Sequence, residues 1–232
     1  MSVIGVIGAM TIEIEMITDS LSTFIEENYA GFHFYVTKYK NLDLILVSCG
    51  GGKVNAACCT QILIDKFHVN KIINTGIAGS LNPKVRLCDT VISEDLTYHD
   101  VRKVQMKTCF PFMESFKADD ELIQLAIKVC TASNFKGYNY HLGRIVTGDA
   151  FISDSDLKSF IIEQYNPCCV EMEGAAIAHV SSINRIPFLV IRSISDNADN
   201  NAEFDYDEFE KIAANNSSRI VLRLLDLLNN NL

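Results

Sequence analysis

Strand-length apolar segments alternate with helix-length segments along this chain, and this alternation limits the fold more than any other feature. The strand-like segments are residues 3–7, 71–74, 85–93, 143–147, 168–172 and 188–194. Helices are expected at 12–27, 54–67, 118–133, 174–182 and 207–228, and 33–39 with 42–48 has the pattern of a hairpin. We therefore predict an α/β fold, a three-layer α/β/α sandwich around a central mixed, largely parallel sheet.

The chain of 232 residues is long enough for one sizeable core, and no linker or change of composition divides it. We expect a single domain over residues 1–232. The net charge of −9 and the absence of a basic stripe argue against a nucleic-acid partner. No apolar run is long enough to span a bilayer, and the first residues lack the basic region of a signal peptide. These observations favour a cytoplasmic protein without a membrane partner.

The eight cysteines do not form a metal-binding pattern. Two pairs are adjacent in the chain, Cys58–Cys59 and Cys168–Cys169, and the spacing typical of zinc sites does not occur. We interpret them as reduced, mostly buried thiols, and we expect no metal.

Glycines and carboxylates gather where the predicted strands end. The segments concerned are GAMTIE (8–13), CGGGK (49–53), NTGIAG (74–79), TGDAF (147–151), VEMEG (170–174) and SISDNAD (193–199). Glycine allows the backbone to approach a ligand closely, and sheets of this kind bind ligands beyond the carboxyl ends of their strands. The sequence therefore predicts a ligand site with several carboxylates at this edge of the sheet.

The segment VEMEG brings two carboxylates close together. Glu171 and Glu173 stand two residues apart in an extended segment, so their side chains point to the same side. Two adjacent negative charges are unfavourable unless a partner satisfies them, and a substrate with two neighbouring hydroxyls would do so. The alternative is a polar strand end, with both carboxylates solvated at the start of a helix.

Two further acids, Glu13 and Asp196, complete a set that suits glycosidic-bond cleavage. In that reaction one acid protonates the leaving group, another carboxylate activates water, and the transition state is an oxocarbenium ion. Glu13 could instead be an exposed acid in the first turn of a helix, and Asp196 a helix cap or Asx turn. Neither a dinucleotide fingerprint nor a P-loop is present.

Eight segments, in this order along the chain, resemble the 5′-methylthioadenosine/S-adenosylhomocysteine nucleosidases of the purine nucleoside phosphorylase superfamily. They are IGVIGAMTIEIE, GGGKVNAA, INTGIAGSL, YHD, FKADD, GDAFI, VEMEGAAIAHV and RSISDNAD. The resemblance spans nearly the whole chain and implies a nucleoside phosphorylase-like fold. It also implies hydrolysis of 5′-thio-substituted adenosines to adenine and a 5-thioribose derivative.

The resemblance also suggests roles for individual residues. It implies that Asp196 protonates adenine N7, that Glu13 positions and activates the water, and that Arg192 supports Glu13. Glu173 would bind ribose hydroxyls and Met172 would pack against the sugar, with Phe151 stacked on adenine and the Ile152 backbone at its edge. The remaining implied substrate-binding residues are Met10, Ala78, Gly79, Val170, Glu171, Ser195, Ala198 and Tyr206, with Tyr206 near the 5′ substituent.

The resemblance implies a homodimer, a small nucleoside substrate and no cofactor. In the family, the loop after YHD crosses the dimer interface and covers the partner's 5′-substituent pocket. In this chain the loop is shorter and its sequence, residues 101–115, differs. The alternatives are a nucleoside phosphorylase, which needs arginines to hold phosphate, and a non-catalytic nucleoside-binding relative. The sequence leaves the preferred 5′ substituent open.

Overall fold

A computed structural model of the chain describes residues 2–132 and 138–230. Its strands are β1 (Val3–Gly8), β2 (Ile25–Tyr29), β3 (Phe32–Tyr39), β4 (Leu42–Ser48), β5 (Lys71–Ser80), β6 (Thr90–Tyr98), β7 (Phe116–Lys117), β8 (Tyr140–Thr147), β9 (Cys169–Glu171) and β10 (Phe188–Asp196). Its helices are α1 (Thr11–Asp19), α2 (Lys53–Asp65), α3 (Lys103–Thr108), α4 (Asp120–Thr131), α5 (Ser155–Tyr165), α6 (Gly174–Ile183) and α7 (Ala202–Asn230).

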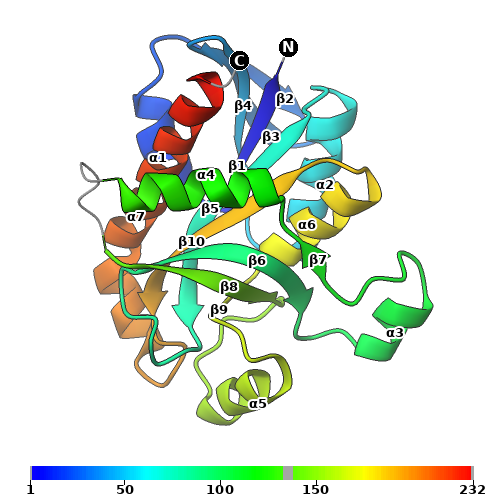
Figure 1. Cartoon of the computed structure of the whole chain (residues 1–232), viewed down its shortest axis with the longest axis vertical. Helices are drawn as coiled ribbons and strands as arrows, with labels where there is room; N and C mark the ends of the chain where they lie inside the picture. The colour runs from blue at the N-terminus through cyan, green and yellow to red at the C-terminus, as the bar shows by residue number, and fades with distance from the viewer. Residues whose placement is uncertain (1, 133–137, 231–232) are drawn as a thin grey trace.

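The strands form one mixed sheet that curls back on itself. Strand order is β10-β6-β8-β9-β5-β1-β4-β3-β2, and β10 also pairs with β5, so five strands close into a ring. The central strands β4, β1, β5 and β10 pair in parallel, whereas β3 with β4 and β2 with β3 are antiparallel. Figure 1 shows β5 and β10 crossing the middle of the molecule side by side.

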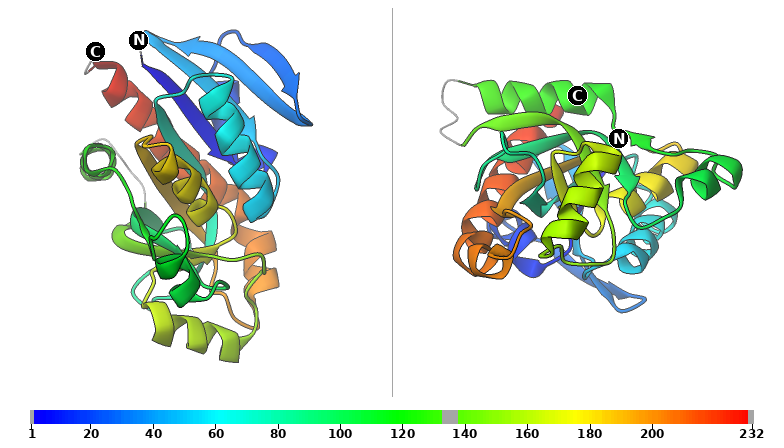
Figure 2. Two further views of the ribbon diagram at one scale, coloured as in Figure 1. Left: turned by 90° about the vertical axis from the view of Figure 1, so that its right-hand side faces the viewer. Right: turned by 90° about the horizontal axis from the view of Figure 1, so that it is seen from below.

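Helices cover the sheet on two sides, as the alternating pattern predicts. Helices α1 and α4 pack against α7, which lies along β5 and β10, while α2 packs against α6 on the other side (Figures 1 and 2). The β2–β3 hairpin and α5 lie at opposite ends of the molecule. The prediction of an α/β fold with a central mixed sheet is confirmed. No helix within residues 2–132 and 138–230 is long and apolar enough to cross a membrane.

The strand ends that carry glycines and carboxylates converge on one edge of the sheet. Parallel pairing of β1 with β4 and β5, and of β5 with β10, brings the segments after residues 8, 48, 80 and 196 together. β8 and β9 are parallel and end side by side, and β9 runs antiparallel to the end of β5 with Val170 opposite Gly79, so the segments after residues 147 and 171 reach the same pocket from the opposite direction. The site described below lies at this edge.

The predicted helix over 12–27 is wrong in its second half. Helix α1 ends at Asp19, and residues 25–29 instead form the edge strand β2, antiparallel to β3. The ring of Phe24 packs edge-on against Tyr35 of β3, with centroids 5.1 Å apart. Phe24 and Ile25 have helical spacing, yet Ile25 begins a strand and Phe24 packs on its partner, because pairing with β3 outweighs the local sequence periodicity.

Three other boundaries differ from the prediction. Strand β5 continues through the glycine-rich segment 75–80, and β6 occupies 90–98 rather than 85–93. Helix α7 begins five residues earlier than expected, and the sequence did not predict helices α3 and α5. The predicted end of the third helical segment, Ser133, lies outside the described residues.

Candidate active site

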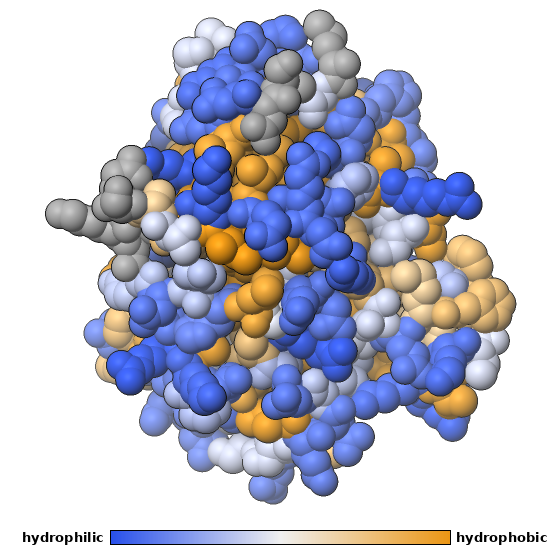
Figure 3. Space-filling model, in the orientation of Figure 1, coloured by the Kyte–Doolittle hydropathy of each residue, from blue (hydrophilic) through white to orange (hydrophobic). Residues whose placement is uncertain are grey.

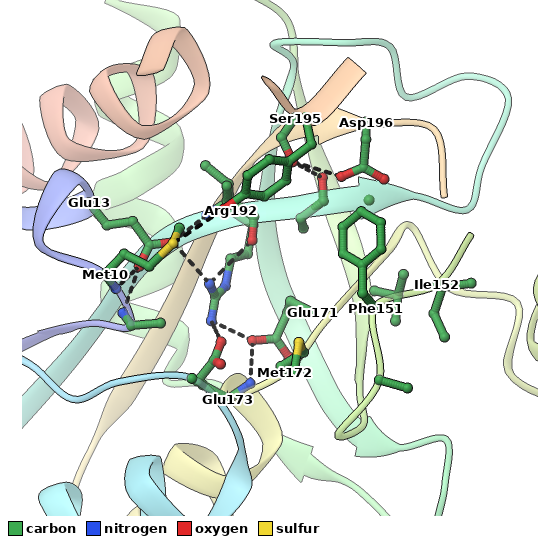
Figure 4. A pocket seen from close by; sticks show the side chains of 18 of the residues that line it. Met10, Glu13, Phe151, Ile152, Glu171, Met172, Glu173, Arg192, Ser195 and Asp196 are labelled. Atoms are coloured by element: carbon green, nitrogen blue, oxygen red, sulfur yellow. Dashed lines mark hydrogen bonds and ion pairs between the residues drawn. The ribbon is translucent and has the colours of Figure 1, made fainter. Parts of the chain in front are cut away.

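A pocket of about 470 Å³ opens at the carboxyl edge of the sheet. It is lined by Ala9, Met10, Glu13, Gly51, Ile77, Ala78, Gly79, Ala150, Phe151, Ile152, Val170, Glu171, Met172, Glu173, Arg192, Ser195, Asp196, Glu203, Tyr206 and Asp207. Two sides differ in character (Figure 4). We call Glu13, Glu171, Glu173 and Arg192 the polar wall, and Phe151, Ile152, Asp196 and Tyr206 the aromatic wall.

Glu13 is the first member of the polar wall and is 1% exposed. One carboxylate oxygen accepts the N–H groups of Ala9 (2.6 Å) and Met10 (2.9 Å), and the other accepts that of Ile77 (3.0 Å). Burial raises the pKa of Glu13, while Arg192 and these N–H groups act in the opposite direction. The alternative of an exposed first-turn acid is therefore wrong, because Glu13 lies on the buried side of α1 with Ile14 and Ile17.

Glu171 has a full set of donors from the protein itself. It accepts hydrogen bonds from Thr147 Oγ1, from the N–H groups of Glu173 (3.1 Å) and Gly174 (2.6 Å), and from Arg192 Nη2. The carboxylates of Glu171 and Glu173 converge on the same guanidinium nitrogen of Arg192. The alternative of two solvated carboxylates is wrong, because both residues are buried.

Glu173 is held more loosely. One of its oxygens accepts the N–H of Gly52 (2.8 Å), and the other lies 3.4 Å from Arg192 Nη2. Burial and the nearby charge of Glu171 raise the pKa of Glu173 to about 7, although Arg192 acts in the opposite direction. Glu173 therefore retains acceptor capacity toward the pocket.

Arg192 is the centre of the polar wall (Figure 4). Its guanidinium lies 3.8 Å from Glu13, contacts Glu171 and Glu173, and donates to Asn74 Oδ1 (2.8 Å) and to the Ile77 carbonyl (3.2 Å). Burial alone would lower the pKa of Arg192, but the three carboxylates raise it. Arg192 is therefore a fixed cation whose charge is already balanced by protein carboxylates.

The glycine pattern of β5 has a steric reason. A Cβ on Gly76 would overlap Arg192 Nη1 and lie 2.5 Å from Glu13 Oε1. A Cβ on Gly79 would lie 2.7 Å from Asp196 Oδ1 and 3.0 Å from the Cβ of Ala198. Because glycine has no side chain, Arg192 and Glu13 can pack against β5 at Gly76, and Asp196 can pack against it at Gly79.

Asp196 ends strand β10 and is buried on the aromatic wall. Its Oδ2 accepts the hydroxyl of Ser195 (2.8 Å), and its Oδ1 accepts the N–H of Ala198 (2.8 Å). The second contact is the Asx turn that the sequence left open as an alternative, and the same carboxyl also lines the pocket. Burial raises the pKa of Asp196, with a smaller contribution from Asp205 and Asp199, although the two hydrogen bonds lower it.

The aromatic wall is more open to solvent than the polar wall. Phe151 is 44% exposed, and its ring meets Tyr206 edge-on at 5.9 Å between centroids. The Tyr206 hydroxyl lies 3.3 Å from Met10 Sδ and donates to Glu210 (2.9 Å). Figure 4 shows Phe151 and Ile152 across the pocket from Met10 and Glu13. The space between these two sides of the pocket can hold a flat, largely apolar ring.

The structure brings almost every predicted site residue to this one pocket. The exception is Ala198, whose contribution is the N–H that it donates to Asp196. Six further residues line the pocket that the sequence does not predict as site residues: Ala9, Gly51, Ile77, Ala150, Glu203 and Asp207. Glu203 lies three residues before Tyr206 and four before Asp207, so this spacing would have indicated a shared helix face if the helix had been predicted to begin at residue 202.

Lys53, just beyond the glycine-rich loop, ties neighbouring loops together rather than lining the pocket. Its ammonium lies 2.6 Å from Asp100 and 3.5 Å from Asp149. Asp100 also accepts the N–H of Asp149 (3.0 Å). These contacts fix the segment that carries Phe151. Among the described residues, no group of three or more His, Cys, Asp or Glu side chains is arranged to hold a metal ion.

The fold and the site together define a class of enzymes. A family model described as the phosphorylase superfamily matches residues 3–226. The 5′-methylthioadenosine/S-adenosylhomocysteine nucleosidase of Staphylococcus haemolyticus is 39% identical over 97% of this chain and 100% of its own length. This chain therefore belongs to the phosphorylase superfamily and, within it, to the 5′-methylthioadenosine/S-adenosylhomocysteine nucleosidases.

Two further relatives show the breadth of the group. The S-adenosylhomocysteine nucleosidase of Streptococcus pyogenes, solved in complex with 5-methylthiotubericidin, has a TM-score of 0.90 and is 31% identical. That match covers 98% of this chain and 97% of the other. An aminodeoxyfutalosine nucleosidase of Campylobacter jejuni is 33% identical over 97% of this chain and 99% of its own length. Family membership therefore defines a glycosidic hydrolase but leaves the 5′ substituent open.

Proposed function

We propose that this chain, as one nucleosidase domain, hydrolyses the N-glycosidic bond of 5′-methylthioadenosine, S-adenosylhomocysteine or both. The products are adenine and a 5-thioribose derivative. The named functions of relatives that match over nearly the whole chain support this substrate class. The proposed reaction involves no metal or organic cofactor.

One observation favours water over phosphate as the second substrate. Among the described residues, Arg192 is the only cationic side chain that lines the pocket, and three carboxylates surround it. Binding phosphate would require unpaired arginines or lysines. The carboxylate of Glu13 would repel an anion, whereas it can accept a proton from water.

In the proposed mechanism, Asp196 is the general acid. Burial favours its protonated form, which donates the proton to adenine N7 as the C1′–N9 bond breaks. The electron pair of that bond leaves with adenine, and the sugar becomes an oxocarbenium ion. The Ser195 hydroxyl and the Ala198 N–H then stabilise the new Asp196 carboxylate.

Glu13 is the general base in this scheme. A water molecule adds to C1′, and its proton passes to the Glu13 carboxylate, which completes the hydrolysis. The three N–H groups around Glu13 hold its ionised form in a fixed orientation. Its burial strengthens it as a base, because the same desolvation that raises a carboxyl pKa favours proton uptake.

Glu173 is the proposed ligand of the ribose hydroxyls. Its neighbour Glu171 already accepts four hydrogen bonds within the protein, so we assign Glu171 the role of holding Arg192 and Glu173 in place. Met172 and Met10 pack on the sugar, and Phe151 and Ile152 receive the adenine. Ala78, Gly79 and Val170 form the floor beneath the base.

The test is release of adenine from 5′-methylthioadenosine by purified protein, with and without phosphate. We expect equal release in both conditions, with 5-methylthioribose as the second product. Release only with phosphate, together with a ribose 1-phosphate product, would make this a phosphorylase. Absence of turnover combined with tight adenine binding would make it a non-catalytic nucleoside-binding relative.

We also propose a homodimer located in the cytoplasm. The α3 side exposes Val104, Phe110 and Phe112, and Figure 3 shows apolar side chains gathered over it. Burying such a surface against a second copy would be favourable. We propose that the neighbouring copy helps to close the site, as the family resemblance implies. Sedimentation with activity measured across a dilution series tests this, and unchanged specific activity in a demonstrated monomer would contradict it.

The cysteines support the proposed location. All eight are free, as expected for a reducing compartment.

A further inference from the structure

One face of α7 forms part of the pocket and carries two acids. Glu203, Tyr206 and Asp207 all line the pocket. Glu203 lies three residues before Tyr206 and four before Asp207, and residues at these spacings on a helix are neighbours, so the two carboxylates stand one turn apart. Sequence comparison with the family assigned no role to either acid.

Neither carboxylate is neutralised by the protein. Glu203 and Asp207 are exposed, and neither has a salt bridge or side-chain hydrogen bond to another described residue. The surrounding segment is acidic, because residues 196–210 contain seven Asp or Glu and no Lys, Arg or His, and the next basic residue, Lys211, stands four positions after Asp207. This part of the pocket therefore has a negative potential that the ligand itself must meet.

Under the proposed function, the 5′ substituent points toward this face. Adenine lies at Asp196 and Phe151, and the ribose hydroxyls lie at Glu173, so the 5′ carbon leaves the sugar away from both. Met10 and Tyr206, which touch each other at 3.3 Å, form the apolar side that a thioether would meet next. A chain extending beyond the sulfur then reaches Glu203 and Asp207.

We propose that Glu203 and Asp207 set the charge preference of the enzyme for its 5′ substituent. They favour alkylthio substituents that carry an ammonium group and disfavour those that end in a carboxylate alone. This inference rests on the proposed function. Because both acids are exposed, their combined effect is modest, about tenfold in kcat/KM between a cationic and an anionic substituent.

The experiment compares two adenosine analogues of similar length, one with a 5′-aminopropylthio group and one with a 5′-carboxyethylthio group. We expect the ratio of their kcat/KM values to favour the amine by about tenfold at low ionic strength, and to fall toward one in about 0.5 M NaCl. The variants E203Q, D207N and the double variant should lower the ratio stepwise at low salt.

The matched control is E15Q combined with E26Q, which removes two exposed acids outside the pocket. It should keep the ratio of the parent protein. A ratio near one in the parent protein, or a ratio that the double variant leaves unchanged, overturns the inference. Turnover of 5′-methylthioadenosine and of S-adenosylhomocysteine by the parent protein separates the two proposals. If either is cleaved while the ratio is one, only the charge preference fails, and if neither is cleaved, the proposed function fails.

Discussion

The polar wall and the aromatic wall of the pocket are built on opposite principles. In the polar wall, Glu13, Glu171 and Arg192 are buried and take their partners from the protein. In the aromatic wall, Phe151 is half-exposed and Tyr206 is only partly covered. The first wall is thus complete before a substrate arrives, whereas the second can adjust to one.

The difference shows that two requirements of such a site, positioning the attacking water and admitting the nucleoside, are met by different walls. Positioning an attacking water needs groups that do not move, and a buried charge network provides this because breaking it costs several kcal/mol. Admitting a nucleoside needs a surface that can open, and half-exposed aromatic rings provide that at low cost. Asp196 connects the two, since it is buried like the polar wall but lies beside Phe151 (Figure 4).

The largest effect is expected from Glu13→Gln in the polar wall. The amide keeps the size of the side chain but cannot accept a proton from water, so kcat for adenine release should fall by about 10³-fold. Glu15→Gln, which changes an exposed acid on the same helix, should retain activity. Turnover retained by a folded Glu13→Gln protein would remove Glu13 from the role of base.

Two glycines of strand β5 allow the walls to be disturbed separately. Gly76→Ala pushes a methyl group into Arg192 and Glu13, and should lower the free energy of unfolding by about 3 kcal/mol. Gly79→Ala pushes against Asp196 instead, so we expect a smaller loss of stability and a large loss of kcat. Denaturant unfolding with kinetics on the same samples measures both quantities.

Gly51→Ala is the control for this pair, because its new Cβ would come no closer than 3.9 Å to Glu173. It should unfold like the parent protein. If Gly76→Ala were equally stable, the polar wall would be more adaptable than its packing indicates.

The polar wall should also give stability an unusual pH dependence. Glu173 has a pKa raised from 4.5 to about 7 in the folded protein, so the folded state binds its proton more tightly than the unfolded chain. The stabilisation is present at low pH and is lost as pH rises between about 4.5 and 7, by about 2–3 kcal/mol. Glu13 and Asp196 act in the same direction, since burial raises the pKa of each.

The measurement is the unfolding free energy of the ligand-free protein at about pH 5 and pH 7.5, for the parent and for Glu173→Gln. The variant should lose less stability than the parent between these values. Glu26→Gln, an exposed acid on the edge strand β2, should follow the parent. Parallel pH profiles for Glu173→Gln and the parent would show that the carboxyl titrates normally.

The smallest effects belong to the aromatic wall. Phe151→Ala removes the ring proposed to stack on adenine and should raise KM by roughly tenfold, since stacking of a base on an aromatic side chain contributes about 1–3 kcal/mol. Tyr206→Phe keeps its ring and loses only the hydroxyl contacts to Met10 and Glu210, so kcat/KM should change by less than about threefold. Equal effects of the two variants would show that the hydroxyl, and not ring contact, matters in this wall.

Much of the fold was predictable because its signals are local. The hairpin at 33–39 and 42–48 and the strand-to-helix step at VEMEG follow from short patterns, and the structure has them within a residue or two. Phe24 and Ile25 were assigned to a helix because their spacing suits one. Only the neighbouring strand β3 makes that segment a strand.

The sequence alone determined that the strands would end in glycines and carboxylates, and that these ends would meet at one edge of the sheet. For β1, β4, β5 and β10 that follows from strand direction, because parallel strands bring their carboxyl ends together. Strands β8 and β9 run opposite to β5, so their ends reach the pocket only through the closed sheet. The tertiary structure decided which charges pair. Arg192 meets Glu13, 179 positions earlier in the chain, only through the register of β5 and β10 and the space left by Gly76. Burial, which depends on the whole fold, then raises the pKa of Glu13, Glu173 and Asp196. Glu203 and Asp207 stay exposed at the edge of the pocket, where a ligand can meet them.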